Sequence, residues 1–126
     1  MVRIIFTLLL LTTVVNAQTT KKNISQKERE AGFRISGEKR ATTDFNNKIY
    51  ILQTLGQNVD KNFDPFLIKI AKEKYNIRLT ESPCVIIGDT RHYAKAMRKK
   101  VLAKFGNDIE DKIKTEALVN FKKSDL

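Results

Sequence analysis

The sequence has 126 residues and a formal net charge of +10 at pH 7, because 24 Lys and Arg residues outnumber 14 Asp and Glu residues. One cysteine excludes an intramolecular disulfide, and one histidine beside that one cysteine excludes the usual nitrogen and sulfur ligand set of a zinc site. The length suits a single domain with an ordinary hydrophobic core, and we expect no cofactor.

The first 17 residues have the pattern of a secretory signal peptide. Arg3 precedes an apolar run from Ile4 to Val15, and Val15 and Ala17 are suited to positions −3 and −1 of a cleavage site. The run is shorter than the roughly 20 apolar residues of a membrane-spanning helix, so we expect the mature chain to have no transmembrane segment. The pattern predicts a secreted or periplasmic protein, cleaved near Ala17.

Residues 18–44 are mostly polar and charged. Their few apolar anchors are Ile24, Phe33 and Ile35, so the segment is interpreted as a mobile arm with a short helix near Ser25 and an extended piece at Phe33–Ile35. Residues 45–126 are expected to form one globular α+β domain.

The first half of that domain gives mixed signals. Residues 47–59 suit a strand or a helix, since a short apolar run does not distinguish the two. Asp64 and Pro65 predict a helix start, with Asp64 as N-cap, and the apolar spacing that follows predicts a helix over 64–75. Alternation at 77–80 and a continuous apolar run at 84–87 predict two short strands.

The second half is read as two helices. The pattern predicts one helix over 90–105, capped by Asp89 or Thr90 and ended by Gly106, and another over 107–122, opened by a capping box of Asn107 and Glu110. The predicted fold class is therefore α+β, with three principal helices and a small two- or three-stranded sheet from segments near 49–54, 77–80 and 84–87.

A basic stripe is the most informative surface feature. Between Arg91 and Lys104 there are six Lys or Arg residues and no acidic residue. Helical spacing places four of these cations opposite the predicted buried face. The apolar side chain of Leu102 is expected to project between them. The four are Arg91, Lys95, Arg98 and Lys99. In one interpretation they form a solvated face that the acidic start of the last helix (Asp108, Glu110, Asp111) partly neutralises. In the other they bind an acidic partner.

Signals for catalysis are weak. A thiol-dependent site would use Cys84 as nucleophile, Asp89 as orienting group and His92 as base, but the predicted strand would separate Cys84 from His92. Cys84 beside an apolar run is expected to be buried. Gly88-Asp89-Thr90 before a helix resembles an anion-binding helix start, yet the Asp89 carboxylate would occupy the amide groups that an anion needs. We assign no catalytic, cofactor-binding or metal-binding residue.

The sequence thus favours a small basic binding or accessory protein that is not an enzyme. Its expected partner is an acidic protein or other polyanion, held through Arg91, Lys95, Arg98 and Lys99. Secretion argues against gene-regulatory nucleic-acid binding. The alternatives are a small hydrolase or thiol-dependent enzyme, and a structural accessory subunit whose partner covers Phe33 and Ile35.

Overall fold

The computed structural model describes residues 24–55, 61–82 and 88–124. Within them the chain forms the helices and strands α1 (Gln26–Asn46), β1 (Tyr50–Leu55), α2 (Asp64–Tyr75), β2 (Ile77–Glu81), α3 (Thr90–Phe105) and α4 (Ile109–Ser124). The predicted α+β class is confirmed, but the described chain has four helices where three principal ones were expected. The predicted signal peptide, Cys84 and the predicted strand at 84–87 lie outside the described residues.

The additional helix is α1, which occupies most of the segment expected to be an arm. Its start is a capping box, in which the Ser25 hydroxyl accepts from the Glu28 amide at 3.2 Å and the Glu28 carboxylate accepts from the Ser25 amide at 3.0 Å. The extended piece expected at Phe33–Ile35 is helical as well. The sequence interpretation was wrong here because the buried residues of α1 are Gly37 and Ala41, too small to produce an apolar periodicity.

Within the described residues the sheet consists of two parallel strands joined through α2. The ambiguous segment 47–59 resolves into a strand at Tyr50–Leu55, and Tyr50 pairs with Ile77 and Leu52 with Leu79. Those four side chains are buried, as expected for one face of a pleated sheet. Asn76, in the left-handed conformation at φ 54°, ends α2 and lets β2 begin at the next residue.

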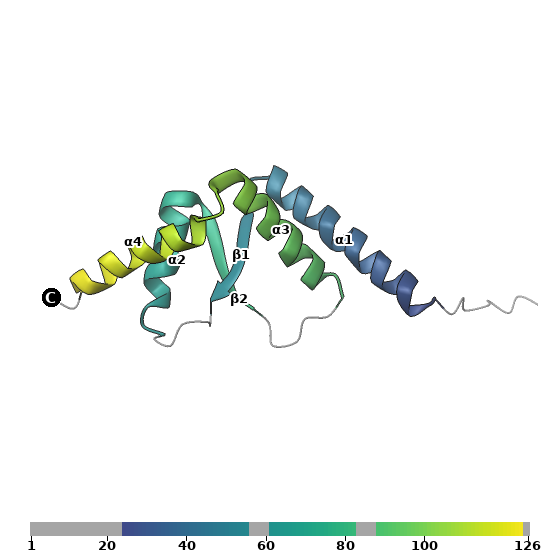
Figure 1. Cartoon of the computed structure of the whole chain (residues 1–126), viewed down its shortest axis with the longest axis horizontal. Helices are drawn as coiled ribbons and strands as arrows, with labels where there is room; N and C mark the ends of the chain where they lie inside the picture. Colours follow the sequence, from purple (N-terminus) through teal and green to yellow (C-terminus); the bar gives the residue numbers. More distant parts are fainter. Residues whose placement is uncertain (1–23, 56–60, 83–87, 125–126) are drawn as a thin grey trace, which may run out of the picture.

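The two strands stand between two helix pairs (Figure 1). On one side α2 packs with α4, and on the other α1 packs with α3. The largest fully buried side chains come from both strands and from α3 and α4, and comprise Leu52, Ile77, Met97, Val101 and Ile109. The buried residues therefore form one core within the described part of the chain, to which α1 contributes Ala41 and α3 contributes Met97 and Val101.

The last two helices follow the predicted order closely. α3 has the expected bounds, buries Tyr93, Met97 and Val101, and ends at Gly106 with φ 102°. α4 begins at Ile109, two residues later than predicted, and Glu110 binds Arg98 where the sequence analysis expected a capping box. No helix in the described part of the chain is both long and apolar enough to cross a membrane.

Candidate functional site

The candidate site lies where α1 and α3 pack together. A Cβ atom on Gly37 would lie 2.5 Å from the Asp89 carbonyl oxygen, so the two helices approach closely at this point. The Asp89 carboxylate accepts from the Ser36 hydroxyl at 3.1 Å and pairs with the Arg40 guanidinium at 3.2 Å. Asp89 is at the N-cap position of α3 as predicted, but its side chain makes no capping hydrogen bond and links α3 to α1.

A second polar contact joins the same helices nearer the core. The Tyr93 hydroxyl donates to the Asp44 carboxylate at 2.8 Å, and the Arg40 guanidinium lies 4.5 Å from the centre of the Tyr93 ring. Burial, followed by the bond to Asp44, raises the pKa of Tyr93 to about 12. Tyr93 therefore stays protonated over the physiological range and keeps α1 fixed on α3.

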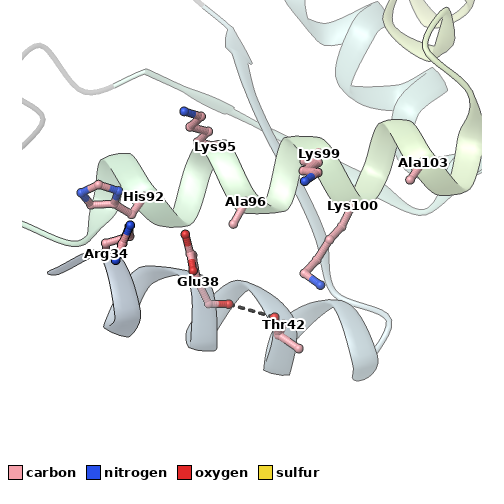
Figure 2. Close-up of a pocket in the computed structure, with 9 residues that line it drawn as sticks. All are labelled: Arg34, Glu38, Thr42, His92, Lys95, Ala96, Lys99, Lys100 and Ala103. Carbon is pink, nitrogen blue, oxygen red and sulfur yellow. Dashed lines mark hydrogen bonds between the residues drawn. The ribbon is translucent and has the colours of Figure 1, made fainter. Parts of the chain in front are cut away.

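A groove of about 580 Å³ runs along the outer side of this helix pair (Figure 2). α1 contributes one wall and α3 the other, and the residues lining it are Arg34, Glu38, Thr42, His92, Lys95, Ala96, Lys99, Lys100 and Ala103. Four of these side chains are cationic and one, Glu38, is a carboxylate. Excluding His92, the lining therefore carries a clear excess of positive charge. We name this feature the basic groove.

The cations of the basic groove differ from several others in the described part of the chain in having no acidic partner there. Within residues 24–55, 61–82 and 88–124, neither an ion pair nor a side-chain hydrogen bond engages Arg34, Lys95 or Lys99. The Lys100 ammonium lies 5.7 Å from the centre of the Phe45 ring. By contrast, Arg40, Lys74, Arg98 and Lys112 each pair with a carboxylate.

The four residues of the predicted basic stripe lie in three different surroundings. Lys95 and Lys99 line the basic groove, whereas Arg98 forms a two-point ion pair with Glu110, one of whose bonds is 2.9 Å. Arg91 is exposed in the first turn of α3 and is not part of the groove lining. Leu102 is partly buried against the core. α3 has α1 on one side and the start of α4 on the other, so its cations do not share one surface.

The structure adds site residues that the sequence analysis missed. Arg34 and Glu38 come from α1, which was interpreted as an arm. Lys100 comes from α3 but was not included in the predicted basic stripe. The spacing of Arg34 and Glu38 by one helical turn was the available signal, but it becomes informative only when that segment is known to be helical. Phe33 and Ile35, which the accessory-subunit alternative expected a partner to cover, are 37% and 61% exposed.

Of the three residues considered for a catalytic thiol, Cys84 lies outside the described residues, and Asp89 and His92 are described. His92 meets Glu30 at 2.8 Å, while the Asp89 carboxylate is engaged by Ser36 and Arg40. In the described ranges, no three His, Cys, Asp or Glu side chains are grouped so that they would hold a metal ion. His92 and Asp89 therefore act as contacts between α1 and α3.

Comparison with protein-family models, curated proteins and solved structures finds no match to this chain.

Proposed function

We propose that the protein is a non-enzymatic binding protein that holds an acidic partner in the basic groove between α1 and α3. The observation that carries the proposal is the imbalance of charge in a concave surface. Four cations and one carboxylate line the groove, and Arg34, Lys95 and Lys99 have no acidic partner in the described part of the chain. An anionic ligand would relieve their mutual repulsion.

The cost of this arrangement supports the proposal. Lys95 and Lys99 are one helical turn apart, and like charges at that spacing destabilise a helix by about 0.2–0.5 kcal/mol per pair. Elsewhere on the same helix, Arg98 has Glu110 as a partner. On the side of α3 that faces α4, an acidic residue therefore pairs with a cation. On the side that lines the groove, cations outnumber carboxylates.

The proposed setting is outside the cytosol, as the pattern of residues 1–17 predicts. There the acidic partners within reach are other secreted proteins and anionic polymers, rather than regulatory sites on a genome. The proposed contact set differs from the sequence-based one. Lys95 and Lys99 remain, Arg34 and Lys100 join them, and Arg98 serves the contact with α4.

A double charge reversal tests the proposal. The variant K95E/K99E is compared with K69E/K114E, which makes the same change in net charge at exposed lysines of α2 and α4. Neither pair is in the core, so both variants should keep the parent's circular dichroism spectrum and unfolding midpoint. Binding to a panel of acidic oligosaccharides, acidic peptides and oligonucleotides is then measured by titration calorimetry over a series of salt concentrations.

We expect the groove variant to lose about 1 kcal/mol of binding free energy per reversed charge at low salt, and the control variant to lose much less. The difference should shrink as added salt shortens the screening length to about 10 Å or less. Equal affinities of the parent and the groove variant for every ligand of the panel at low salt would remove the proposal. Equal losses of binding free energy in K95E/K99E and K69E/K114E would also remove it.

A further inference from the structure

We propose that the ligand of the basic groove is an acidic polysaccharide, a linear chain that carries both anionic groups and hydroxyl groups. This inference rests on the proposed function and deepens it. The proposal depends on the cations and the carboxylate that line the groove together, and on the kinds of side chain that are missing from the described lining.

The first observation is the unpaired carboxylate on the α1 wall. Glu38 extends from α1 towards α3 in Figure 2, yet no side-chain hydrogen bond or ion pair engages its carboxylate within the described residues. The one bond drawn at Glu38 is made by its backbone oxygen, which accepts from the Thr42 hydroxyl at 2.9 Å. The carboxylate is therefore an available acceptor within a group of cations.

That acceptor discriminates between classes of anion. A ligand with anions alone would meet the four cations favourably but would be repelled by Glu38. A ligand with hydroxyl donors between its anions would satisfy both, because a hydroxyl donating to a carboxylate forms a strong, charge-assisted hydrogen bond. Acidic sugars, whether they carry carboxylate or sulfate groups, combine these two kinds of group on each unit.

The second observation is the lining between the two walls. It includes the small side chains Ala96, Ala103 and Thr42, and no Phe, Tyr or Trp is among the described lining residues. Bases of a single-stranded nucleic acid would find no aromatic ring to stack on among these residues. An aromatic or aliphatic anchor of a protein partner would find little apolar area, because Ala96 and Ala103 are the apolar side chains of the described lining. This lining therefore suits a polar chain better than either.

The third observation is the shape. The α3 wall extends from His92 to Ala103, which corresponds to about 16 Å of helix axis, and Lys95 and Lys99 follow one another along it. A linear ligand lying parallel to α3 would place successive anions beside successive cations. A compact small anion would leave most of the groove unused.

The test compares ligands of matched length and total charge: an oligouronate, a sulfated oligosaccharide, an oligoglutamate peptide and an oligothymidylate. The parent protein should bind at least one of the two oligosaccharides more tightly than the peptide and the oligonucleotide, by several-fold at low salt. The variant Glu38→Ala should then weaken oligosaccharide binding about tenfold, as expected for the loss of a hydrogen bond to a charged group.

The same variant should strengthen binding of the peptide and the oligonucleotide, because neither has hydroxyl groups along its repeating units and the removal of a repelling charge outweighs the loss of an acceptor for their N–H groups. Glu73→Ala, at an exposed position on α2, is the matched control and should leave the order and size of all four affinities unchanged. The opposite signs for sugar and non-sugar ligands are a result that a general charge effect does not produce.

Two outcomes would overturn the inference: tighter binding of all four ligands by Glu38→Ala, or parent affinities for both oligosaccharides no higher than for the peptide and the oligonucleotide. In either case K95E/K99E would still weaken binding if the proposed function holds. If K95E/K99E has no effect on any ligand, the proposed function itself fails. The two failures are therefore distinguishable.

Discussion

A Cβ atom on Gly37 would lie 2.7 Å from the backbone nitrogen of Tyr93. The Asp89 carbonyl oxygen would be closer still, at 2.5 Å, and both are backbone atoms, which do not turn aside as the end of a side chain does. Contact between α1 and α3 thus requires glycine at position 37. Because these two helices form the walls of the basic groove, Gly37 also determines how far apart those walls stand.

Gly37→Ala should therefore separate α1 from α3. We expect a loss of about 1–3 kcal/mol in the free energy of unfolding, the usual range for overpacking, measured by urea unfolding followed by circular dichroism. Gly32→Ala on the same helix is the control, since nothing lies within 4 Å of the added methyl group. That substitution should stabilise the protein by up to about 1 kcal/mol through helix propensity. Equal stability of the two variants would contradict the close approach.

Tyr93 should make stability depend on alkaline pH. Its pKa is raised from 10 to about 12 in the folded protein, so its contribution is fully present below pH 10 and is lost as the pH rises towards 12. The shift corresponds to up to about 3 kcal/mol. Tyr93→Phe should lack this pH dependence, so the free energy of unfolding of the parent should fall relative to that of Tyr93→Phe as the pH rises from 10 towards 12.

Tyrosinate absorbance measured during a pH titration checks this assignment. The difference between the parent and Tyr93→Phe should be one group titrating near pH 12. A difference curve centred at pH 10 would show that the Tyr93 hydroxyl is not buried against Asp44.

Arg98 and Glu110 should act together on stability and little on ligand binding. Their side chains are 50% and 30% exposed, so a double-mutant cycle with Arg98→Gln and Glu110→Gln should give a coupling of about 0.5 kcal/mol. Calorimetric titration with the acidic ligand should show a smaller loss of affinity for Arg98→Gln than for Lys99→Gln. A larger loss for Arg98→Gln would place it in the binding surface, as the sequence alone suggested.

Glu116 should contribute to stability in a way that acid removes. The nearby Lys74 ammonium and then the hydrogen bond from the Tyr75 hydroxyl, which is 2.9 Å long, lower the pKa of Glu116 below its usual value of 4.5. Its contribution is present above pH 4.5 and is lost as the pH falls through the folded-state pKa. Urea unfolding across the acid range should show a smaller acid-induced loss for Glu116→Gln and for Lys74→Met than for the parent. An unchanged profile in both variants would argue against this contact between α2 and α4.

Much of the fold was predictable because its signals are local. The start of α2 follows from Pro65, the end of α3 follows from Gly106, and the apolar periodicity within each helix predicts its length. These features act within one or two helical turns. α1 was not predictable in this way. Its buried side is made by Gly37 and Ala41, whose role is to allow close packing, and a small residue has no distinctive pattern until the opposing helix is known.

The sequence by itself determined the basic character of α3, since the spacing of Lys95 and Lys99 and the absence of acidic residues between Arg91 and Lys104 are properties of the chain. Only the tertiary structure decided which of those cations line the basic groove. α4 places Glu110 against Arg98, and α1 brings Arg34 and Glu38 to Lys95 and Lys99 from about 60 positions earlier in the chain. Charge pairing over such separations depends on how helices pack, and helical spacing within one segment carries no information about it.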